Sequence, residues 1–203
     1  FSGNILINKT KKELIDIYFA RANILHKKKN YKDSARYLEL ANKLKIEINL
    51  SNPNMIFKKS RELLLESDKK EVNKKEYRKF SESIFIVGMP RSGSTLLESI
   101  LSMSNDVCDL GETNILEESY IECKTSQREN ELAEIYFQKV NNKRGLEITT
   151  NKYLYNYQYV DIIVRHIPNA KIIHCYRNPL DNILSIYRAH FARGNEYSSS
   201  LVD

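Results

Sequence analysis

The sequence has no apolar run that approaches the ~20 residues a helix needs to cross a membrane. It also lacks an initiator Met, since it begins at Phe1, and its first residues lack the charged-then-apolar order of a signal peptide. Hydrophobic residues make up 41% and charged residues 29% of the 203 positions, a balance typical of a globular protein in water. We therefore predict no membrane segment in this chain, and we expect further sequence upstream of Phe1.

Cysteine is scarce. The three cysteines, Cys108, Cys123 and Cys175, are odd in number and form no C-x-x-C pair, which argues against a disulfide framework and a zinc site. No cluster of ligand-type side chains has metal-site spacing, so we predict no metal cofactor. Cys108 and Cys175 lie in apolar segments and are predicted to be small buried hydrophobes. These features favour a reducing compartment, and we predict a cytoplasmic protein.

Acidic residues are too few to balance the basic ones in the first part of the chain. Residues 1–80 hold 20 Lys and Arg against 10 Asp and Glu, whereas residues 81–203 hold 12 against 16. The early lysines, such as Lys27–Lys29, indicate solvated helix ends, because they lack the interleaved aromatic residues of a nucleic-acid-binding element. We therefore predict no nucleic-acid partner.

Two helices are predicted near the start, over residues 11–26 and 31–44, by apolar residues at helical spacing. A polar Lys-Lys-Asn break separates them, which predicts a helical hairpin. The pattern resembles one tetratricopeptide repeat, with Ser34 where the repeat prefers Ala; the matching residues are Tyr18, Ala22, Leu25, Tyr31, Leu38 and Ala41. The resemblance implies a surface for a protein partner. The alternative is a generic helix pair that packs on the next domain.

The character of the chain changes twice after this hairpin. A third helical pattern covers Met55–Leu65, and the stretch from 67 to 83 is dense in charge and poor in apolar residues. A continuous apolar run begins at Ile84. We therefore predict three parts: a helical region over 1–66, a linker over 67–83, and a second domain over 84–203.

Strands alternate with helices in the second domain. Ile84–Val87 and Lys171–Tyr176 are short apolar runs, typical of strands buried on both faces of a parallel sheet. The expected helices cover residues 129–139, 154–167 and 179–191, together with a helix after residue 95 whose apolar face is Leu96, Leu97, Ile100 and Leu101. This alternation predicts an α/β fold in which helices flank a parallel sheet.

A phosphate-binding loop is predicted over Gly88–Thr95, which follows the first strand and fits G-x-x-x-x-G-x-T. The backbone N–H groups of such a loop wrap an anion at a helix N-terminus, and Gly93 permits the close turn. Ser94 stands where a nucleotide triphosphatase has the lysine that reaches the γ-phosphate. A cation stands instead at Arg91, whose forked guanidinium suits phosphate or sulfate oxygens without Mg²⁺. An ordinary ATPase is therefore disfavoured.

The segment Pro90–Thr95 resembles the 5′-phosphosulfate loop of sulfotransferases, in the Arg form of the tyrosylprotein and carbohydrate branches. The segment Tyr176–Ser185 is similar to the 3′-phosphate element of that family, with Arg177 at a strand end and Ser185 within a helix. With the helical hairpin, the chain looks like the tetratricopeptide-repeat-containing bacterial sulfotransferases. The resemblance implies a P-loop-like, three-layer α/β core over 84–203, preceded by a small all-α region. It implies 3′-phosphoadenosine 5′-phosphosulfate as donor, bound by Arg91, Ser92, Gly93, Ser94, Thr95, Arg177 and Ser185.

Two further residues match the tyrosylprotein branch. Glu112, in a Gly-Glu pair, corresponds to the proposed general base, and Lys152, in an Asn-Lys pair, to the lysine that neutralises the leaving group. The resemblance implies a sulfotransferase in which Glu112 takes the acceptor proton while Arg91, Lys152 and the Ser94 hydroxyl stabilise the transferring group. It implies a peptide tyrosine or carbohydrate hydroxyl as acceptor. The alternatives are that Glu112 is an exposed helix cap or ion-pair partner and that Lys152 is an ordinary surface lysine.

The histidines match no catalytic pattern. We predict His174 and His166 to be core residues, and the spacing of His190 assigns it no role. The family's fold continues beyond the helix that carries Ser185, so we expect a core that is incomplete at its C-terminal end, binds adenosine bisphosphate weakly and turns over poorly.

Two other function classes stay open at this point. One is a non-catalytic helical-repeat scaffold that retains a vestigial phosphate-binding loop. The other is a nucleotide-kinase-like phosphotransferase, which would bind Mg·ATP. Thermal stabilisation by adenosine 3′,5′-bisphosphate but not by Mg·ATP would support the sulfotransferase.

Overall fold

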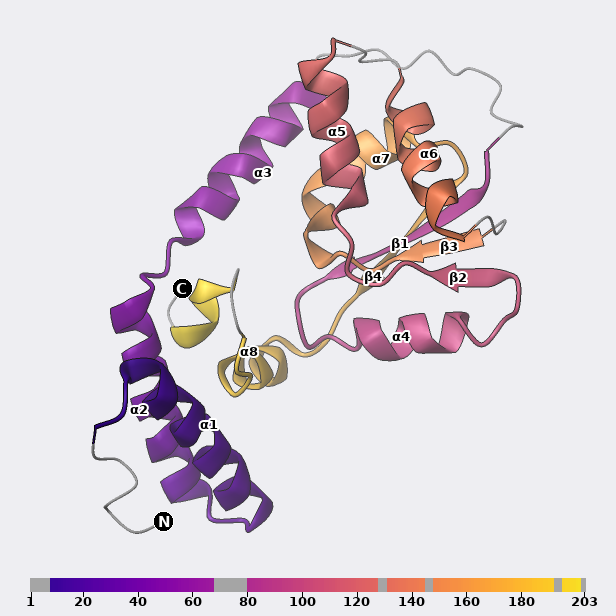
Figure 1. The fold of residues 1–203 in the computed structure, drawn as a ribbon. Helices are drawn as coiled ribbons and strands as arrows, with labels where there is room; N and C mark the ends of the chain where they lie inside the picture. Colours follow the sequence, from indigo (N-terminus) through magenta and orange to yellow (C-terminus); the bar gives the residue numbers. More distant parts are fainter. Residues whose placement is uncertain (1–7, 68–79, 128–130, 145–147, 192–194, 202–203) are drawn as a thin grey trace. The chain divides into compact units, whose positions relative to one another are not determined.

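A computed structural model describes residues 8–67, 80–127, 131–144, 148–191 and 195–201 (Figure 1). The chain forms two compact units, each of which is described by itself. The first comprises residues 1–56 with 178–203, and the second comprises residues 57–177. Most of the predicted linker lies outside the described residues, and the boundaries 1–66, 67–83 and 84–203 stay a prediction.

The first unit is built on the predicted helical hairpin, formed by α1 (Lys11–Lys27) and α2 (Tyr31–Ile48). Thr10 begins α1 with a capping box: its Oγ1 accepts the N–H of Glu13 at 3.3 Å, and its own N–H donates to Glu13 Oε2 at 2.8 Å. Figure 1 shows the two helices running side by side in opposite directions.

Small and large side chains interlock between α1 and α2. The buried apolar set is Ile15, Phe19, Ala22, Leu38 and Ala41. Ser34 is also buried, and its Oγ donates a 2.8 Å hydrogen bond to the carbonyl oxygen of Ala22. This bond satisfies the hydroxyl at a position where only a small side chain fits between the helices. The hairpin is confirmed, while its assignment to the tetratricopeptide repeat stays a prediction.

The end of the chain belongs to the same unit. The helix α8 (Pro179–Tyr187) starts after Asn178, whose side chain accepts two N–H groups of the first turn, and its first residue is the proline that suits this position. Tyr187 packs against the hairpin, and Asn42 of α2 donates to the carbonyl oxygen of Tyr187 at 3.1 Å. The short 3₁₀ helix η4 (Glu196–Ser199) follows.

The second unit contains a four-stranded sheet in which every pair of neighbours is parallel. The spatial order of the strands is β2-β3-β1-β4. Their bounds are Glu82–Gly88 (β1), Val107–Asp109 (β2), Ile148–Asn151 (β3) and Ala170–Cys175 (β4). The parallel sheet confirms the α/β fold class.

Helices cover both faces of this sheet. Figure 1 shows α4 on one face and α5, α6 and α7 on the other, which makes three layers. The bounds are Ser94–Leu101 (α4), Ile115–Thr125 (α5), Leu132–Arg144 (α6) and Val160–His166 (α7), with the 3₁₀ helix η3 over Leu154–Tyr159. The helix α3 (Pro53–Ser67) precedes the sheet in the chain.

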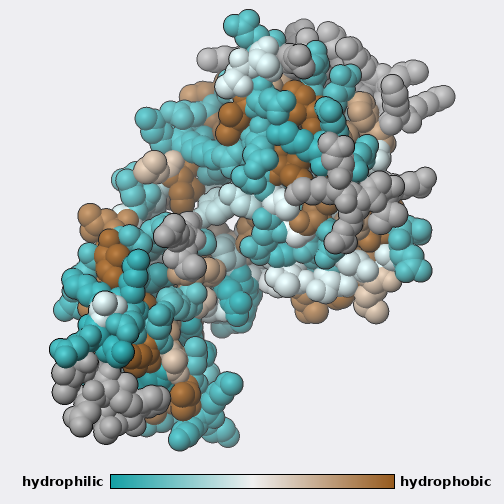
Figure 2. Space-filling view, in the orientation of Figure 1, coloured by the Kyte–Doolittle hydropathy of each residue, from teal (hydrophilic) through white to brown (hydrophobic). Residues whose placement is uncertain are grey.

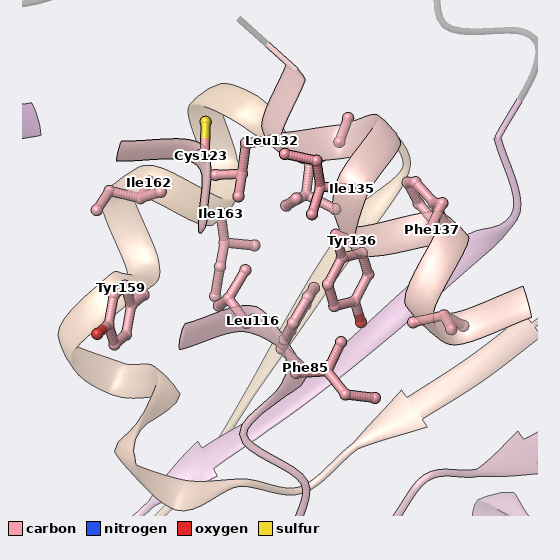
Figure 3. Close-up of a cluster of buried hydrophobic side chains, with 14 of the residues drawn as sticks. Phe85, Leu116, Cys123, Leu132, Ile135, Tyr136, Phe137, Tyr159, Ile162 and Ile163 are labelled. Atoms are coloured by element: carbon pink, nitrogen blue, oxygen red, sulfur yellow. The ribbon is translucent and has the colours of Figure 1, made fainter. Parts of the chain in front are cut away.

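The main core lies between the sheet and the layer that contains α5, α6 and α7 (Figure 3). Phe85 of β1 and Tyr136 of α6 are both fully buried, with ring centroids 5.6 Å apart. Leu116 of α5 and Ile163 of α7 are also fully buried in this cluster. Burying four such side chains stabilises the fold by about 1.5–3 kcal/mol each. The core therefore fixes β1, and with it the start of the loop that follows.

The buried face of α4 differs from the predicted one. The residues turned to the interior are Ser94 and Glu98, which are buried, whereas Leu96 and Ile100 are 68% and 55% exposed. Two of the four residues of the predicted apolar face are therefore exposed, whereas the other two, Leu97 and Leu101, are half-buried. Ser94 and Glu98 face the sheet, and both lie in the candidate active site.

The strand β4 is also more exposed than predicted. It is an edge strand, so one side of its backbone is unpaired within the described sheet. His174 is exposed and Cys175 only half-buried, so both were wrongly predicted as core, whereas Cys108 is buried as predicted. The expected helix over 154–167 is divided into η3 and α7.

Hydrophilic side chains cover most of the visible face in Figure 2, and hydrophobic ones show between them in small groups. Within the described parts of the chain, no helix is both long and apolar enough to cross a membrane.

Candidate active site

The loop after β1 begins at a glycine that no other residue can replace without strain. Gly88 has φ of +143°, and a Cβ placed on it would lie 2.4 Å from the carbonyl oxygen of Cys175. Gly88 and Cys175 are paired neighbours at the ends of β1 and β4. The missing side chain thus lets the two parallel strands stay paired to their last residue while the chain turns into the loop.

The loop then turns into α4 through backbone that is rare outside glycine. Arg91 has φ of +68°, and Gly93, at the N-cap of α4, has φ of +100°. Among the described residues no side chain caps α4, so a ligand can accept hydrogen bonds from its first N–H groups. Ser92 Oγ is buried and has no hydrogen-bond partner among the described residues. Successive N–H groups at a helix start, with an unsatisfied hydroxyl beside them, suit a bound anion.

The second predicted binding element meets the first at Arg177. This residue comes directly after the segment Cys175–Tyr176 at the end of β4, and its Nη1 donates to the carbonyl oxygen of Arg91 at 3.3 Å. Both arginines are exposed. The pairing of β1 with β4 therefore brings the Arg177 guanidinium to the backbone of Arg91, which is 86 residues away in sequence. Ser185 lies on α8, in the other unit, and its part in the same site stays a prediction.

Glu112 and Lys152 meet at the neighbouring strand ends. Leu110 donates its N–H to the carbonyl oxygen of Thr150 at 2.9 Å, and Lys152 donates its N–H to that of Gly111 at 3.0 Å. These bonds extend the pairing of β2 with β3 past the ends of both strands. As a result, Lys152 Nζ lies 2.6 Å from Glu112 Oε1. The carboxyl ends of adjacent parallel strands form the usual ligand-binding edge of such sheets.

The two members of this ion pair differ in exposure. The side chain of Lys152 is 6% exposed and that of Glu112 is 66% exposed. The alternative of Lys152 as an ordinary surface lysine is therefore wrong. An ammonium fixed in the interior, paired with a carboxylate that solvent and ligands reach, provides a stationary cation next to a proton acceptor.

A third charged residue, Glu98 of α4, belongs to this cluster and was not predicted. Its side chain is 8% exposed; Oε1 accepts a 3.1 Å hydrogen bond from Thr150 Oγ1, and Oε2 lies 4.0 Å from Lys152 Nζ. Burial raises the pKa of the Glu98 carboxyl above its usual value of 4.5. A carboxylate between apolar residues in the loop helix was the available sequence signal, but the periodicity of Leu96 and Ile100 assigned the buried face to the wrong side.

Asn151 fixes the turn that carries Lys152. It is buried, and its Oδ1 accepts two 3.0 Å hydrogen bonds, from the backbone N–H of Tyr153 and from Nδ2 of Asn156. The amide thus ties the end of β3 to the start of η3. Lys152 lies between the end of β3 and the start of η3, so these hydrogen bonds fix the backbone that carries its side chain.

The histidines lie apart from this cluster in sequence. His166 is half-buried at the end of α7. His190, in the first unit, stacks on Phe19 with ring centroids 4.6 Å apart and places Nδ1 3.5 Å from Asp16 Oδ1. Burial lowers the pKa of His190. These contacts account for His190 as a packing residue of the hairpin.

Comparisons with known proteins identify the family of the chain. A family model described as "Sulfotransferase family" matches residues 83–203. A protein of Aquifex aeolicus (strain VF5), described as "Uncharacterized protein", is 31% identical over 134 residues; the match covers 54% of this chain and 17% of that protein. No solved structure matches. The family match spans more than half of the chain and begins at β1, so it includes the loop, the Glu112–Lys152 pair and Arg177. The chain belongs to the sulfotransferase family.

Proposed function

We propose that the protein transfers a sulfuryl group from 3′-phosphoadenosine 5′-phosphosulfate to a hydroxyl group. The observation that carries this proposal is the 2.6 Å pair of Lys152 and Glu112, in which a buried cation and an exposed carboxylate stand at adjacent strand ends. The helix that begins at the phosphate-binding loop contributes Glu98 to the same cluster. Anion binding and proton transfer are thereby provided by connected elements of one sheet.

The donor's 5′-phosphosulfate is proposed to bind at Arg91–Thr95. Ser92 Oγ and Thr113 Oγ1 are buried hydroxyls with no partner among the described residues. Buried polar atoms are normally satisfied, so a ligand rich in acceptor oxygens fits this loop. Arg177, which contacts the loop, is proposed to bind the donor's 3′-phosphate together with Ser185.

In the proposed reaction, the acceptor oxygen attacks the donor sulfur. An O–S bond forms, and the S–O bond to the 5′-phosphate breaks with its electron pair on the phosphate oxygen. The acceptor's proton goes to the Glu112 carboxylate, which is 66% exposed and so open to the acceptor. Lys152, Arg91 and the Ser94 hydroxyl are proposed to offset the charge that develops on the bridging oxygen and the sulfuryl group. The products are a sulfate ester and adenosine 3′,5′-bisphosphate.

The acceptor is proposed to be a peptide tyrosine or a carbohydrate hydroxyl, and the helical hairpin of α1 and α2 to be a surface for a protein partner. A reducing, cytoplasmic setting is also proposed, because the three cysteines are odd in number and form no C-x-x-C pair. The match covers 17% of the length of the Aquifex aeolicus protein, so the activity, acceptor and partners of a whole protein of that length are proposals.

The test is sulfuryl transfer by wild type and by Glu112→Gln, with ³⁵S-labelled donor and two acceptors, a tyrosine-containing peptide and an oligosaccharide. We expect Glu112→Gln to lower kcat by about 100-fold or more, because the acceptor's proton has no base. Its affinity for adenosine 3′,5′-bisphosphate is expected to stay near that of wild type.

Glu118→Gln is the matched control, because it makes the same change at an exposed position on α5. It is expected to turn over like wild type. If Glu112→Gln transferred sulfuryl as fast as this control, Glu112 would not be the base. If wild type neither transferred sulfuryl nor bound adenosine 3′,5′-bisphosphate, the proposed function would be wrong.

A further inference from the structure

Glu98 is a buried carboxylate that the proposed reaction does not use. It lies on the inner side of α4, and 6% of the residue is exposed. Leaving a carboxylate in the interior is costly unless cations and hydrogen bonds compensate. The described residues supply a hydrogen bond from Thr150, which is fully buried, a backbone hydrogen bond from Gly111, and the cation Lys152.

Lys152 stands between two carboxylates of opposite character. Its Nζ lies 2.6 Å from Glu112, which is exposed and follows β2, and 4.0 Å from Glu98, which is buried on α4. Glu98 is held by its bond to Thr150, whereas the Glu112 side chain is 66% exposed. One partner of the ammonium is thus buried and hydrogen-bonded, and the other is open to solvent.

This asymmetry matters because Glu112 has two tasks in the proposed reaction. It pairs with Lys152 at 2.6 Å, yet in the proposed reaction it must also reach the acceptor hydroxyl to take its proton. If Glu112 were the only carboxylate beside Lys152, the Lys152 ammonium would shift its position when the Lys152–Glu112 ion pair opened. Misplacement of a reacting group by about 1 Å is enough to lower a rate by about 100-fold.

We propose that Glu98 is a positioning residue: its buried carboxylate, fixed by Thr150, holds the Lys152 ammonium in place when Glu112 leaves it to accept the proton of the acceptor. The inference rests on the proposed function, since it assigns Glu98 a task only if Lys152 and Glu112 act in sulfuryl transfer. It concerns a residue that contacts neither reacting group and acts through Lys152.

The charges around Glu98 make this arrangement costly for stability. Burial raises its pKa, and so does the negative charge of Asp109 on β2, while the bond from Thr150 and the charge of Lys152 lower it. Glu112 is the other carboxylate at Lys152. A raised pKa means that the ionised form of Glu98 destabilises the fold. Its contribution to the free energy of unfolding is fully present below the unfolded pKa near 4.5 and is lost as pH rises through the folded value. The Glu98→Gln variant carries no such ionised group at neutral pH, so it escapes this destabilisation.

The experiment compares Glu98→Gln, Lys152→Met and the double variant with wild type, and uses Glu118→Gln as the exposed control on α5. Three quantities are measured: kcat with ³⁵S-labelled donor and a tyrosine-containing peptide, the Kd of adenosine 3′,5′-bisphosphate, and the unfolding midpoint at pH 7. We expect Glu98→Gln to lower kcat by about 10- to 100-fold, to leave the Kd nearly unchanged and not to lower the unfolding midpoint. The acid limb of its kcat profile should move to lower pH, because Glu98 no longer protonates.

The stability measurements test the coupling without turnover. Lys152→Met is expected to lower the unfolding midpoint, because it leaves Glu98 buried without its cation, and adding Glu98→Gln is expected to restore part of the loss. Additive effects of the two substitutions on the unfolding midpoint would overturn the inference. A lower unfolding midpoint in Glu98→Gln, together with its lower kcat, would overturn it too, because Glu98 would then be a structural residue. Unchanged kcat in Glu98→Gln would overturn it as well.

Failure of the proposed function gives a different result. In that case wild type neither transfers sulfuryl nor binds adenosine 3′,5′-bisphosphate, whatever the cycle shows. If wild type does both and Glu98→Gln matches it in kcat and in the acid limb, the proposed function stands and the role of Glu98 falls.

Discussion

At the scale of single residues, the chemistry of the site follows from where strands end. Glu112 and Lys152 are 40 residues apart in sequence, and their side chains meet because β2 and β3 are adjacent and parallel. Arg91 and Arg177 meet for the same reason at β1 and β4. Loops after parallel strands gather at one edge, so residues that share no local pattern converge on one ligand.

Most of these residues could be predicted from the sequence, and Glu98 could not. Arg91 and Arg177 each stand in a motif after an apolar strand, and Glu112 and Lys152 each stand in a short motif that resembles one of the tyrosylprotein branch. Glu98 has no such motif. Its burial depends on the rotation of α4 about its axis, which is set by packing against β1 and β2 and not by the helix's own apolar period.

The first residue-scale prediction concerns Gly88. Gly88→Ala is expected to lower the free energy of unfolding by about 1–3 kcal/mol, because its Cβ would lie 2.4 Å from the carbonyl oxygen of Cys175. Gly93→Ala is the control, since a Cβ there has no atom within 4 Å and only its φ of +100° is unfavourable. Urea unfolding measures both. A loss in Gly88→Ala no larger than that in Gly93→Ala would show that the contact with β4 is not what requires glycine.

At the scale of elements, the helical hairpin was the easiest part to predict. The two apolar stripes gave the starts of α1 and α2 at residues 11 and 31, because each helix buries one stripe against the other. The strand β3 was not predicted. Its four residues, Ile148–Asn151, are mostly polar and buried, since Thr150 and Asn151 face the site and the turn that follows it.

The element-scale prediction concerns the cap of α1. The pKa of Glu13 is lowered from 4.5 to about 2, first by the N–H of Thr10 and then by Lys9. A lowered pKa means that this contribution to stability is present above pH 4.5 and is lost as pH falls toward 2. In Glu13→Gln, the first amides of α1 are expected to exchange hydrogen faster than in wild type at pH 7, and the difference should shrink near pH 2.

The matched control for the cap is Glu39→Gln, at an exposed position within α2. It is expected to exchange like wild type at both pH values. Equal exchange of the α1 amides in Glu13→Gln and wild type at pH 7 would contradict the capping role of this carboxylate.

At the scale of the whole molecule, the chain combines a sheet with a binding edge and a helical hairpin on which α8 packs. Sequence predicted both architectures, since the change from helical to strand periodicity near residue 84 is abrupt. It could not predict that α8 packs with the hairpin, because that contact joins Asn42 to Tyr187 across 145 residues. Contacts of such separation leave no periodic signal in either segment.

The central claim is that the loop after β1, with Arg177, binds a phosphosulfate nucleotide. Its most direct test is thermal unfolding of the 203-residue chain with adenosine 3′,5′-bisphosphate, Mg·ATP or adenosine 5′-monophosphate. At a ligand concentration 100 times the Kd, the bisphosphate would add about 2.7 kcal/mol to the free energy of unfolding and raise the unfolding temperature by several degrees.

The other ligands separate the phosphate sites. Adenosine 5′-monophosphate, which lacks the 3′-phosphate, is expected to give a smaller rise, and Arg177→Ala should reduce the response to the bisphosphate to about that level, because the 3′-phosphate then loses its guanidinium. We expect a clear rise with the bisphosphate and none with Mg·ATP. A rise with Mg·ATP and none with the bisphosphate would show that the loop does not bind a phosphosulfate nucleotide.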